Sequence, residues 1–438
     1  MPNNTHVTLT APRRLRGVVT VPGDKSISHR AVLFNALARG KARITNFLVG
    51  ADCLSTIQCM QALGATIERN DTTVTVQGVG VRGLREPNDV LDCGNSGTTL
   101  RLLAGILAGQ PFFSVLTGDA SLRSRPQRRI VEPLRALGAT LDGRSDGDRA
   151  PIMVRGTAMH GGSYTLKVAS AQVKSALLLA ALAGDAPLQL DGRIDSRDHT
   201  ERMLAAMGVD IGIGLNSITL FPPIEDHTSR LIPAPLSLRV PGDPSSAAFW
   251  WVAAAIHPDA ELTTPAVCLN PTRTGALDAL QAMGADITIS AERVESGEPI
   301  GDVTVRSSNL RGTTLAGELI PRLIDEIPVL AIAAACATGS THIRDAQELR
   351  AKETDRITTV VEGLNALGVQ AQAVEDGMHI AGMAGAGLRG TVLASHHDHR
   401  LAMAWAIAAL VAHPQTTIAD ADAVQVSYPT FWETWHSL

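Results

Sequence analysis

The sequence predicts an α/β fold of two domains, each built from three copies of one module. Two signatures repeat along the 438-residue chain. In the first, a helix ends at a glycine and a strand follows, as in "ALGATI" (62–67), "AMGVDI" (206–211) and "AMGADI" (282–287). Glycine suits the left-handed conformation that ends many helices. In the second, a polar cluster opens a helix of small apolar residues. The distance along the chain from one polar cluster to the next is too long for a solenoid repeat. It indicates duplication of a mixed α/β module.

The polar clusters give the order of six modules. They begin near Asp24, Asn95, Ala171, Asp243, Asp325 and Asp398, which lie 71, 76, 72, 82 and 73 residues apart. The fourth cluster, in "VPGDPSSAAF" (240–249), resembles the first, in "VPGDKSISHR" (21–30), so we expect a domain break there. The predicted domains are 21–241 and 1–20 plus 242–438. The sixth module lacks a final helix-end glycine, and we expect residues 1–20 to complete its sheet.

The opening helices of the modules are apolar on nearly every side. Examples are "VKSALLLAALAG" (173–184) and "LAMAWAIAALVA" (401–412), and a helix of this kind is buried all round. Only 3% of the residues are aromatic, so small and aliphatic side chains must fill the core. We therefore expect helices inside and sheets outside in each domain. If the buried helices begin at a comparable height in each domain, their N-termini point toward the cleft between the domains. A multiply anionic ligand would bind there.

Composition excludes several classes of function. Apolar residues make up 45% of the chain and the net charge is −5 without a basic stripe, so we expect no nucleic-acid partner. The N-terminus has no signal-peptide pattern, and the most apolar helices are too short to span a membrane. The five cysteines are odd in number and form no C-x-x-C pair. This favours a reduced, cytoplasmic enzyme or binding protein for small molecules, and we expect a monomer.

The first polar cluster contains Lys25 and Ser26 shortly after a glycine. A nucleotide-binding phosphate loop requires G-x-x-x-x-G-K-[ST], whereas the glycine here stands two positions before the lysine. A helix start nevertheless favours an anion through its unpaired N–H groups and its dipole, to which Lys25 and Arg30 add full charges. The alternative is a solvated helix cap with charged neighbours.

The other clusters of the first domain also suit phosphate or hydroxyl groups. Gly97 stands at a helix start in "GNSGTTLR", where a plain N-cap is the alternative. In "GDASLRSRPQRR" a proline fixes a turn that aims Arg125 inward, although a surface charge run is the default for such a stretch. The clusters "SAQVKSA" and "DSRDHTERM" add further candidates for binding phosphate or hydroxyls, namely Ser170, Gln172, Ser196 and Arg197.

The second domain holds three charged clusters. They contain Asp325 in "RLIDEIPVLA", Lys352, Glu353 and Arg356 in "ELRAKETDRI", and Arg400 in "HHDHR". A carboxylate before an apolar helix complements its dipole, with a plain cap as the alternative. A run of charged residues such as the second cluster usually forms exposed side-chain pairs along a helix surface. The third suggests a metal site but has no partner cluster such as H-E-x-x-H, so we expect no metal.

Together these stretches resemble the enolpyruvyl transferases, and among them the EPSP synthase family. Nine stretches match in family order between residues 22 and 403: "PGDKSISHR", "GNSGTTLR", "DASLRSRP", "SAQVKSA", "SRDHTE", "NPTRTG", "IDEIPVLA", "LRAKETDR" and "HDHRLAM". The resemblance implies a two-domain inside-out α/β barrel of six βαβαββ units, with the active site in the cleft between the domains. It also implies transfer of the enolpyruvyl group of phosphoenolpyruvate to the 5-hydroxyl of shikimate 3-phosphate, with release of phosphate, in aromatic amino acid biosynthesis. No metal, nucleotide or organic cofactor is implied.

The resemblance also assigns roles to single residues. Those implied to bind shikimate 3-phosphate are Lys25, Ser26, Arg30, Ser170, Ala171, Gln172, Ser196, Arg197, Asp325 and Lys352. Those implied to bind phosphoenolpyruvate are Lys25, Gly97, Arg125, Gln172, Arg356 and Arg400. The implied catalytic groups are Asp325 as base at the 5-hydroxyl and Glu353 as acid at the methylene carbon, beside Lys25. Lysine and arginine offset the charge of two anionic substrates, and addition followed by elimination needs an acid and a base.

One departure from the family pattern, one expectation about inhibition and two rival functions bear on this resemblance. Many family members carry a lysine where this chain has Val426, so we expect no site residue beyond Arg400. Some members carry alanine at the position of Gly97, which crowds the herbicide glyphosate in the phosphoenolpyruvate site, so glycine implies a sensitive enzyme. One rival is the UDP-N-acetylglucosamine enolpyruvyl transferase family, which has a Lys-Asn pair and a loop cysteine that this chain lacks. The other is a non-catalytic binder of phosphorylated metabolites, which would not need Asp325 and Glu353.

Overall fold

The structure is a computed structural model that describes residues 5–223, 233–384 and 387–438. The chain divides into two compact units. Unit 1 comprises Met1–Pro22, Pro241–Val294 and Pro299–Leu438, and unit 2 comprises Gly23–Val240 and Glu295–Glu298. The chain therefore passes from unit 1 to unit 2 after Pro22 and returns after Val240.

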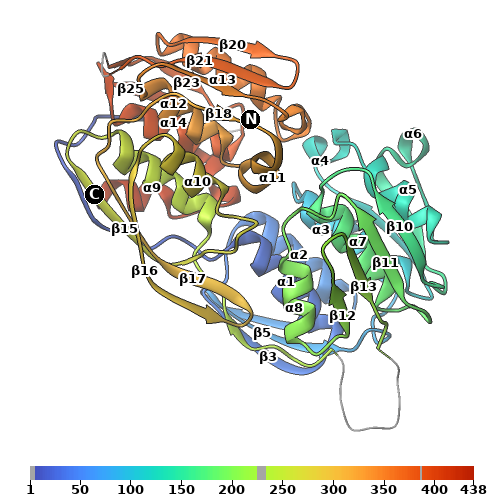
Figure 1. Ribbon diagram of the computed structural model, residues 1–438. Coiled ribbons are helices and arrows are strands. Elements are labelled where there is room, and N and C mark those ends of the chain that lie inside the picture. Colours follow the sequence, from blue (N-terminus) through green and yellow to red (C-terminus); the bar gives the residue numbers. More distant parts are fainter. Residues whose placement is uncertain (1–4, 224–232, 385–386) are drawn as a thin grey trace. The chain divides into compact units, whose positions relative to one another are not determined.

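Unit 2 contains three four-stranded sheets with one pattern of pairing (Figure 1). In each sheet the first strand is parallel to the second, and the remaining pairs are antiparallel. In sheet order the strands are β14 (Leu238–Arg239), β3 (Arg39–Thr45), β5 (Thr73–Val79) and β4 (Thr66–Asn70); β6 (Leu91–Asp92), β7 (Phe113–Thr117), β9 (Arg149–Arg155) and β8 (Thr140–Gly143); and β10 (Gly162–Leu166), β11 (Leu188–Gly192), β13 (Ser217–Leu220) and β12 (Ile211–Ile213). Strand β14 follows the third sheet along the chain but pairs with a strand of the first sheet. This pairing links the end of the three-module unit to its beginning.

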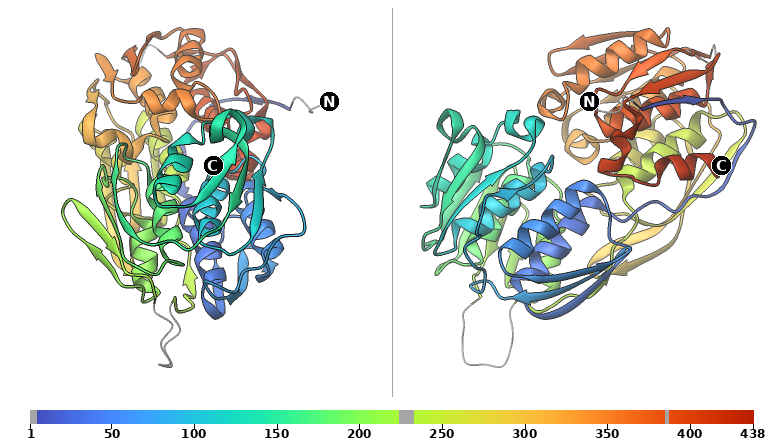
Figure 2. Two further views of the ribbon diagram at one scale, coloured as in Figure 1. Left: turned by 90° about the vertical axis from the view of Figure 1, so that its right-hand side faces the viewer. Right: turned by 180° about the vertical axis from the view of Figure 1, so that it is seen from behind.

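Unit 1 repeats the pattern of one parallel pair followed by an antiparallel pair. Its main sheets are β2 (Leu15–Val18), β15 (Ala260–Cys268), β17 (Glu298–Arg306) and β16 (Asp286–Glu295); β18 (Thr314–Leu315), β19 (Ser340–Ile343), β21 (Gly377–Ala381) and β20 (Gln370–Val374); and β23 (Val392–Ala394), β25 (Thr416–Ala419) and β1 (His6–Leu9). A short pair, β22 (Leu388–Arg389) and β24 (Ala412–His413), accompanies the last sheet. Strand β1 pairs antiparallel with β25, so residues 6–9 belong to the sixth sheet, as predicted (Figure 2). Residues 15–18 differ from the prediction, because β2 pairs with β15 in the fourth sheet.

In the described part of the chain, each of the six main sheets carries one buried helix, and five of them also carry one half-buried helix. The buried helices are α1 (Lys25–Leu37), α3 (Gly97–Ala108) and α7 (Ala171–Ala181) in unit 2, and α9 (Pro244–Ile256), α12 (Ile327–Cys336) and α14 (His399–Ala409) in unit 1. The half-buried helices are α2 (Ala51–Ala62), α5 (Arg128–Ala136), α8 (His199–Ala206), α10 (Gly275–Ala282) and α13 (Arg356–Ala366). Shorter turns are α4 (Ala120–Ser124), α6 (Arg144–Gly147), η1 (Gly317–Leu319), α11 (Ile320–Leu323), η2 (Gln347–Ala351), η3 (Ala421–Val426) and α15 (Phe431–His436). The predicted α/β fold with helices inside and sheets outside is confirmed.

The six predicted clusters stand where the six buried helices begin. Five of these helices have a side-chain cap that accepts a hydrogen bond from a backbone N–H of the first turn, supplied by Asp24, Ser96, Ser170, Asp243 and Asp398. The exception is α12, which begins after Glu326 without such a bond. Capping satisfies N–H groups that the helix leaves unpaired, which explains the polar residue at each start.

Glycine has two distinct roles in this fold. The helix-end glycines have φ between +83° and +102°, the left-handed region predicted from their sequence, at Gly64, Gly138, Gly208, Gly284 and Gly368. Inside α3, Gly105 instead allows close packing, because a Cβ there would lie 2.1 Å from the carbonyl oxygen of Ala176 in α7. The two buried helices therefore approach at their backbones, which brings their N-termini together.

Candidate functional site

Lys25 is the first residue of α1 and forms an ion pair with Asp52 of α2. Both side chains are largely buried, with 18% and 8% of their surface exposed. One carboxylate oxygen of Asp52, Oδ1, is buried and accepts no hydrogen bond from the described residues. The ion pair thus holds a partly exposed ammonium group at the start of a helix, where the dipole also favours an anion.

Arg30 lies one turn further along α1 and is 3% exposed. Its guanidinium donates to the hydroxyl oxygens of Thr200 (2.8 Å) and Ser175 (2.9 Å) and to the backbone carbonyl of Ser26 (3.0 Å). These contacts join α1 to α7 and α8. Any ligand of Arg30 must therefore share the guanidinium with these groups.

Gln172 connects the start of α7 to the start of α3. Its Oε1 accepts from Arg101 at 2.6 Å, and its Nε2 donates to Thr98 at 3.1 Å. A Cβ at Gly97 would lie 3.2 Å from the Arg101 guanidinium and 3.7 Å from that of Arg125. Gly97 thus lies beside both Arg101 and Arg125, and Arg101 also binds Gln172.

Arg125 ends α4 and points back toward α3. Its guanidinium donates to the side-chain oxygen of Asn95 (2.5 Å), to the backbone carbonyl of Asn95 (3.3 Å) and to Ser121 (3.1 Å). The side chain is 9% exposed, so the predicted inward orientation is observed and the alternative of a surface charge does not hold for this residue.

The remaining candidates of unit 2 lie at the start of α7 and in the loop before α8. Ser170 caps α7, and Ala171 and Gln172 form its first turn. Ser196 and Arg197 precede α8, and the buried Lys174 donates to the Ser196 carbonyl at 3.1 Å. The hydroxyl of Ser196 is buried and has no hydrogen-bond partner among the described residues. A buried hydroxyl in that state is expected to bind a water molecule or a ligand.

Unit 1 brings all five predicted charged residues into one cluster. They come from the turn before α12, the segment from the end of η2 to the first residue of α13, and the start of α14. Asp325 lies 3.2 Å from Lys352, 3.7 Å from Arg356 and 4.0 Å from Arg400. Glu353 binds Arg356 at 2.6 Å. Two carboxylates therefore share one cluster with three cations.

Arg356 is the centre of this cluster and is fully buried. It donates to both carboxylate oxygens of Asp398, at 2.8 and 3.0 Å, and to Glu353. Burial disfavours the charged guanidinium, but the carboxylates of Asp398, Glu353 and Asp325 outweigh burial and raise the pKa of Arg356 above its ordinary value. Arg356 therefore stays a cation that binds carboxylates from three separate segments.

Arg400 differs from Arg356 in how its guanidinium is held. Its nearest charged partners in the described part of the chain are Asp325 at 4.0 Å and Glu326 at 3.8 Å. Both contacts are longer than hydrogen bonds, and 11% of the side chain is exposed. Arg400 thus keeps hydrogen-bond donors that can bind an anion. The corresponding donors of Arg356 already bind carboxylates.

Sequence reasoning missed the acidic partners of the predicted cations. Asp52 pairs with Lys25, and Asp398 pairs with Arg356 across 42 residues. The sequence marks Asp398 only as the start of a buried helix. Arg273, in the matching stretch "NPTRTG", had no assigned role and binds Asp243 at 3.0 Å. Local patterns identify caps and charge runs, but they carry no signal for pairs that form between modules.

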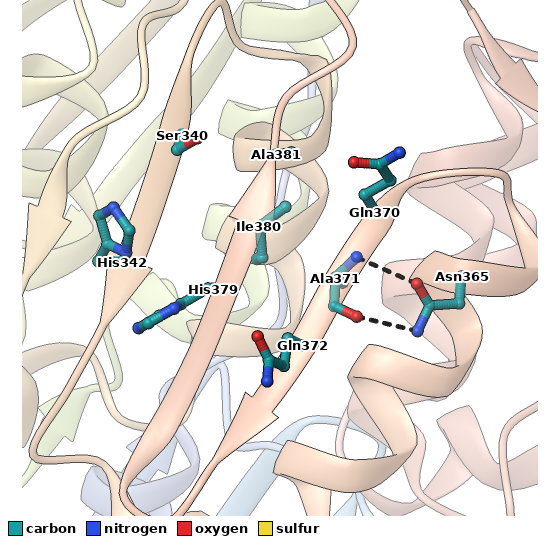
Figure 3. A pocket seen from close by; sticks show the side chains of 9 residues that line it. All are labelled: Ser340, His342, Asn365, Gln370, Ala371, Gln372, His379, Ile380 and Ala381. Atoms are coloured by element: carbon teal, nitrogen blue, oxygen red, sulfur yellow. Dashed lines mark hydrogen bonds between the residues drawn. The ribbon is translucent and has the colours of Figure 1, made fainter.

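A hollow lies elsewhere in unit 1, on the sheet of β19, β21 and β20. It measures about 420 Å³, and its lining includes His342 and His379, which are paired on the neighbouring strands β19 and β21 with ring centres 4.6 Å apart (Figure 3). None of its lining residues belongs to the predicted site. Over the ranges that the structure covers, no group of three or more acidic, histidine or cysteine side chains is arranged to hold a metal. Nor is any described helix both long and apolar enough to cross a membrane.

A buried histidine beside this site predicts a pH effect on stability. His29 is fully buried in α1 and shares a hydrogen bond of 2.7 Å with Thr56. Burial lowers the pKa of His29 well below its ordinary value, and the charges of Lys25 and Arg30 lower it further. The imidazole is thus neutral in the folded protein and gains a proton on unfolding below about pH 6.5. Its contribution to stability is full above that pH and is lost below it, at up to about 1.4 kcal/mol per pH unit.

Denaturant unfolding between pH 5 and 8 tests this expectation. As the pH is lowered from 6.5, the free energy of unfolding of the wild type should decrease more steeply than that of His29→Gln, which has no titrating group at position 29. Parallel curves for the two proteins would show that His29 is not the group responsible.

Comparison with known proteins adds an independent line of evidence. The family model described as EPSP synthase (3-phosphoshikimate 1-carboxyvinyltransferase) matches residues 9–435. A 3-phosphoshikimate 1-carboxyvinyltransferase of Chloroflexus aurantiacus is 70% identical over 429 residues, covering 98% of each chain. One from Desulforudis audaxviator is 52% identical over 98% of each chain. The solved structure of EPSP synthase from Acinetobacter baumannii matches with a TM-score of 0.87 and 41% identity, over 99% of this chain and 98% of that one.

Proposed function

This chain belongs to the EPSP synthase family, and from that premise we propose which of its residues bind the two substrates and move the protons. The family is one of transferases, and the chain transfers the enolpyruvyl group of phosphoenolpyruvate to shikimate 3-phosphate. The observation that carries the assignment of residues is the single cluster in unit 1 that combines Asp325 and Glu353 with Lys352, Arg356 and Arg400.

The residues of unit 2 are proposed to bind the acceptor. Shikimate 3-phosphate would bind at the start of α1 and α7 and in the loop before α8, through Lys25, Ser26, Arg30, Ser170, Ala171, Gln172, Ser196 and Arg197. The partly exposed ammonium of Lys25 and the unpartnered hydroxyl of Ser196 support this assignment. Lys25 and Gln172 would also reach phosphoenolpyruvate, with Gly97 and Arg125 beside them.

The residues of unit 1 are proposed to carry the chemistry. Asp325, helped by Lys352, would take the proton of the 5-hydroxyl as its oxygen forms a bond to C2 of phosphoenolpyruvate. Glu353 would give a proton to C3 in this addition and take one back as the C2–phosphate bond breaks and phosphate leaves. Arg356 and Arg400 would offset the charge of phosphoenolpyruvate.

Further parts of the proposal concern what surrounds the reaction. We infer that the chain works as a monomer in the cytoplasm, without a metal or organic cofactor and without a nucleic-acid partner. Acid–base chemistry on two small anions requires only the side chains already named.

Phosphate release in a coupled assay tests the activity. Release should require both phosphoenolpyruvate and shikimate 3-phosphate, and UDP-N-acetylglucosamine should not replace the acceptor. Release with the nucleotide sugar would favour the related family that uses it. Tight binding of both substrates without release would favour a non-catalytic binder.

Gly97→Ala is expected to weaken ligands that reach the start of α3 and to leave the others unchanged. The new methyl group would press on the Arg101 guanidinium at 3.2 Å, which holds Gln172. We expect the inhibition constant of glyphosate to rise by about tenfold or more and the KM of phosphoenolpyruvate to rise severalfold, since crowding by one methyl costs about 1–3 kcal/mol. The KM of shikimate 3-phosphate should stay within about twofold. Equal losses for all three ligands would contradict the assignment of Gly97.

A further inference from the structure

Glu326 is a buried carboxylate that the reaction described above does not use. It is 2% exposed and directly follows Asp325 in the turn before α12. Its Oε1 accepts a short hydrogen bond from Ser245 of α9, while its Oε2 is buried and has no partner among the described residues. Keeping a carboxylate in this state is unfavourable unless a nearby cation compensates its charge. A neutral side chain would fill the same volume without that penalty.

The compensating cation is Arg400, whose guanidinium faces both adjacent carboxylates. One of its terminal nitrogens lies 3.8 Å from Glu326, and the other lies 4.0 Å from Asp325. Neither contact is short enough to be a hydrogen bond. The guanidinium is therefore balanced between two carboxylates without being committed to either.

A chain of polar contacts fixes the position of Glu326. Arg273 is buried and donates to the Ser245 hydroxyl at 2.9 Å and to Asp243 at 3.0 Å. Ser245 in turn donates to Glu326. These contacts attach the carboxylate to the start of α9, so it cannot follow Arg400 if the guanidinium moves.

We propose that Glu326 is a positioning residue, which holds the Arg400 guanidinium for the anionic groups of phosphoenolpyruvate and away from Asp325. The inference rests on the proposed function only for the identity of the ligand. Without the charge of Glu326, Arg400 has Asp325 as its nearest carboxylate and moves toward it. A guanidinium paired with the base has fewer donors for substrate.

Glu326→Gln tests the proposal, since it removes the charge and keeps the shape. We expect the KM of phosphoenolpyruvate to rise by about tenfold or more, the loss typical of a misplaced charge-assisted contact, with the KM of shikimate 3-phosphate within about twofold. Calorimetric titration of phosphoenolpyruvate, with shikimate 3-phosphate present, should show the same loss of affinity. Glu362→Gln, an exposed change in α13 of the same unit, is the matched control and should resemble wild type.

The outcomes separate a positioning role from a structural one. An unchanged affinity for phosphoenolpyruvate in Glu326→Gln overturns the proposal. So does an equal loss for both substrates together with a lower unfolding midpoint, because that is the result of general disruption. Absence of phosphate release from the wild-type protein would instead contradict the proposed function. In that case the calorimetric affinity for phosphoenolpyruvate still decides the role of Glu326.

Discussion

Asp325→Asn is expected to lower turnover by a factor of about 10² or more, as is typical when a general base is lost. Asparagine has nearly the same shape and keeps an oxygen toward Lys352, which lies 3.2 Å from the native carboxylate. What it loses is the ability to accept the proton of the 5-hydroxyl. Binding of shikimate 3-phosphate should therefore stay within a few-fold, because all but one of its other proposed ligands are in unit 2 and the remaining one, Lys352, is kept.

Steady-state kinetics and equilibrium binding, measured on the same preparation, decide this prediction. The expected signature is a large fall in kcat with a nearly unchanged dissociation constant for shikimate 3-phosphate. Glu362→Gln serves as the control for loss of a carboxylate in the same unit. Near-normal turnover of Asp325→Asn would remove this residue from the mechanism, whereas a lost fold would appear as a lower unfolding midpoint.

The fold was predictable because its evidence is local and repeated. A cap such as Asp24 and a helix-end glycine such as Gly64 act within one turn of their helix, so their signals stand in a few consecutive letters. Repetition along the chain then showed that these signals mark modules. The fully apolar sequence of α12, whose side chains are buried, likewise indicated an inner helix.

The exchange of strands between modules was not predictable in the same way. Strand β14 immediately precedes α9 but pairs in parallel with β3, while β2 precedes α1 but pairs with β15. Either strand has the length and composition for either sheet. The choice depends on how three modules close into a set, which is a property of the assembled unit and not of a short stretch.

The candidate site shows the same division between local and long-range evidence. The cations were found from their own clusters, and Lys352, Arg356 and Arg400 do lie around Asp325. Their acidic partners were not found, because a pair such as Arg356 and Asp398 forms only when two modules pack. Arg356 forms hydrogen bonds with its acidic partners, whereas Arg400 lies farther from its own. This difference depends on residues from other modules, so the sequence alone predicts the same role for both arginines.

Replacement of Arg356 is expected to have the largest effect on stability. Arg356→Met should lower the free energy of unfolding by about 3–5 kcal/mol, because it leaves buried carboxylates without their cation. Asp398 is fully buried, and besides Arg356 its carboxylate accepts hydrogen bonds only from the Arg400 backbone (2.9 Å) and Thr354 (3.2 Å) within the described part of the chain. Glu353 loses the same partner. Methionine fills part of the volume, so the stranded charge and not a cavity dominates the loss.

Two further variants separate charge from packing in this prediction. Arg356→Lys keeps the charge but cannot bind both oxygens of Asp398 as a planar fork, so it should lose less stability than Arg356→Met. Adding Asp398→Asn to Arg356→Met removes one stranded carboxylate and should restore part of the loss, with a coupling of about 1–3 kcal/mol between the two changes. Denaturant unfolding of wild type, Arg356→Met, Arg356→Lys, Asp398→Asn and the double variant gives these values. If Arg356→Met lost less than about 1 kcal/mol, or if the two changes were simply additive, the buried pair would not be a determinant of stability in this unit.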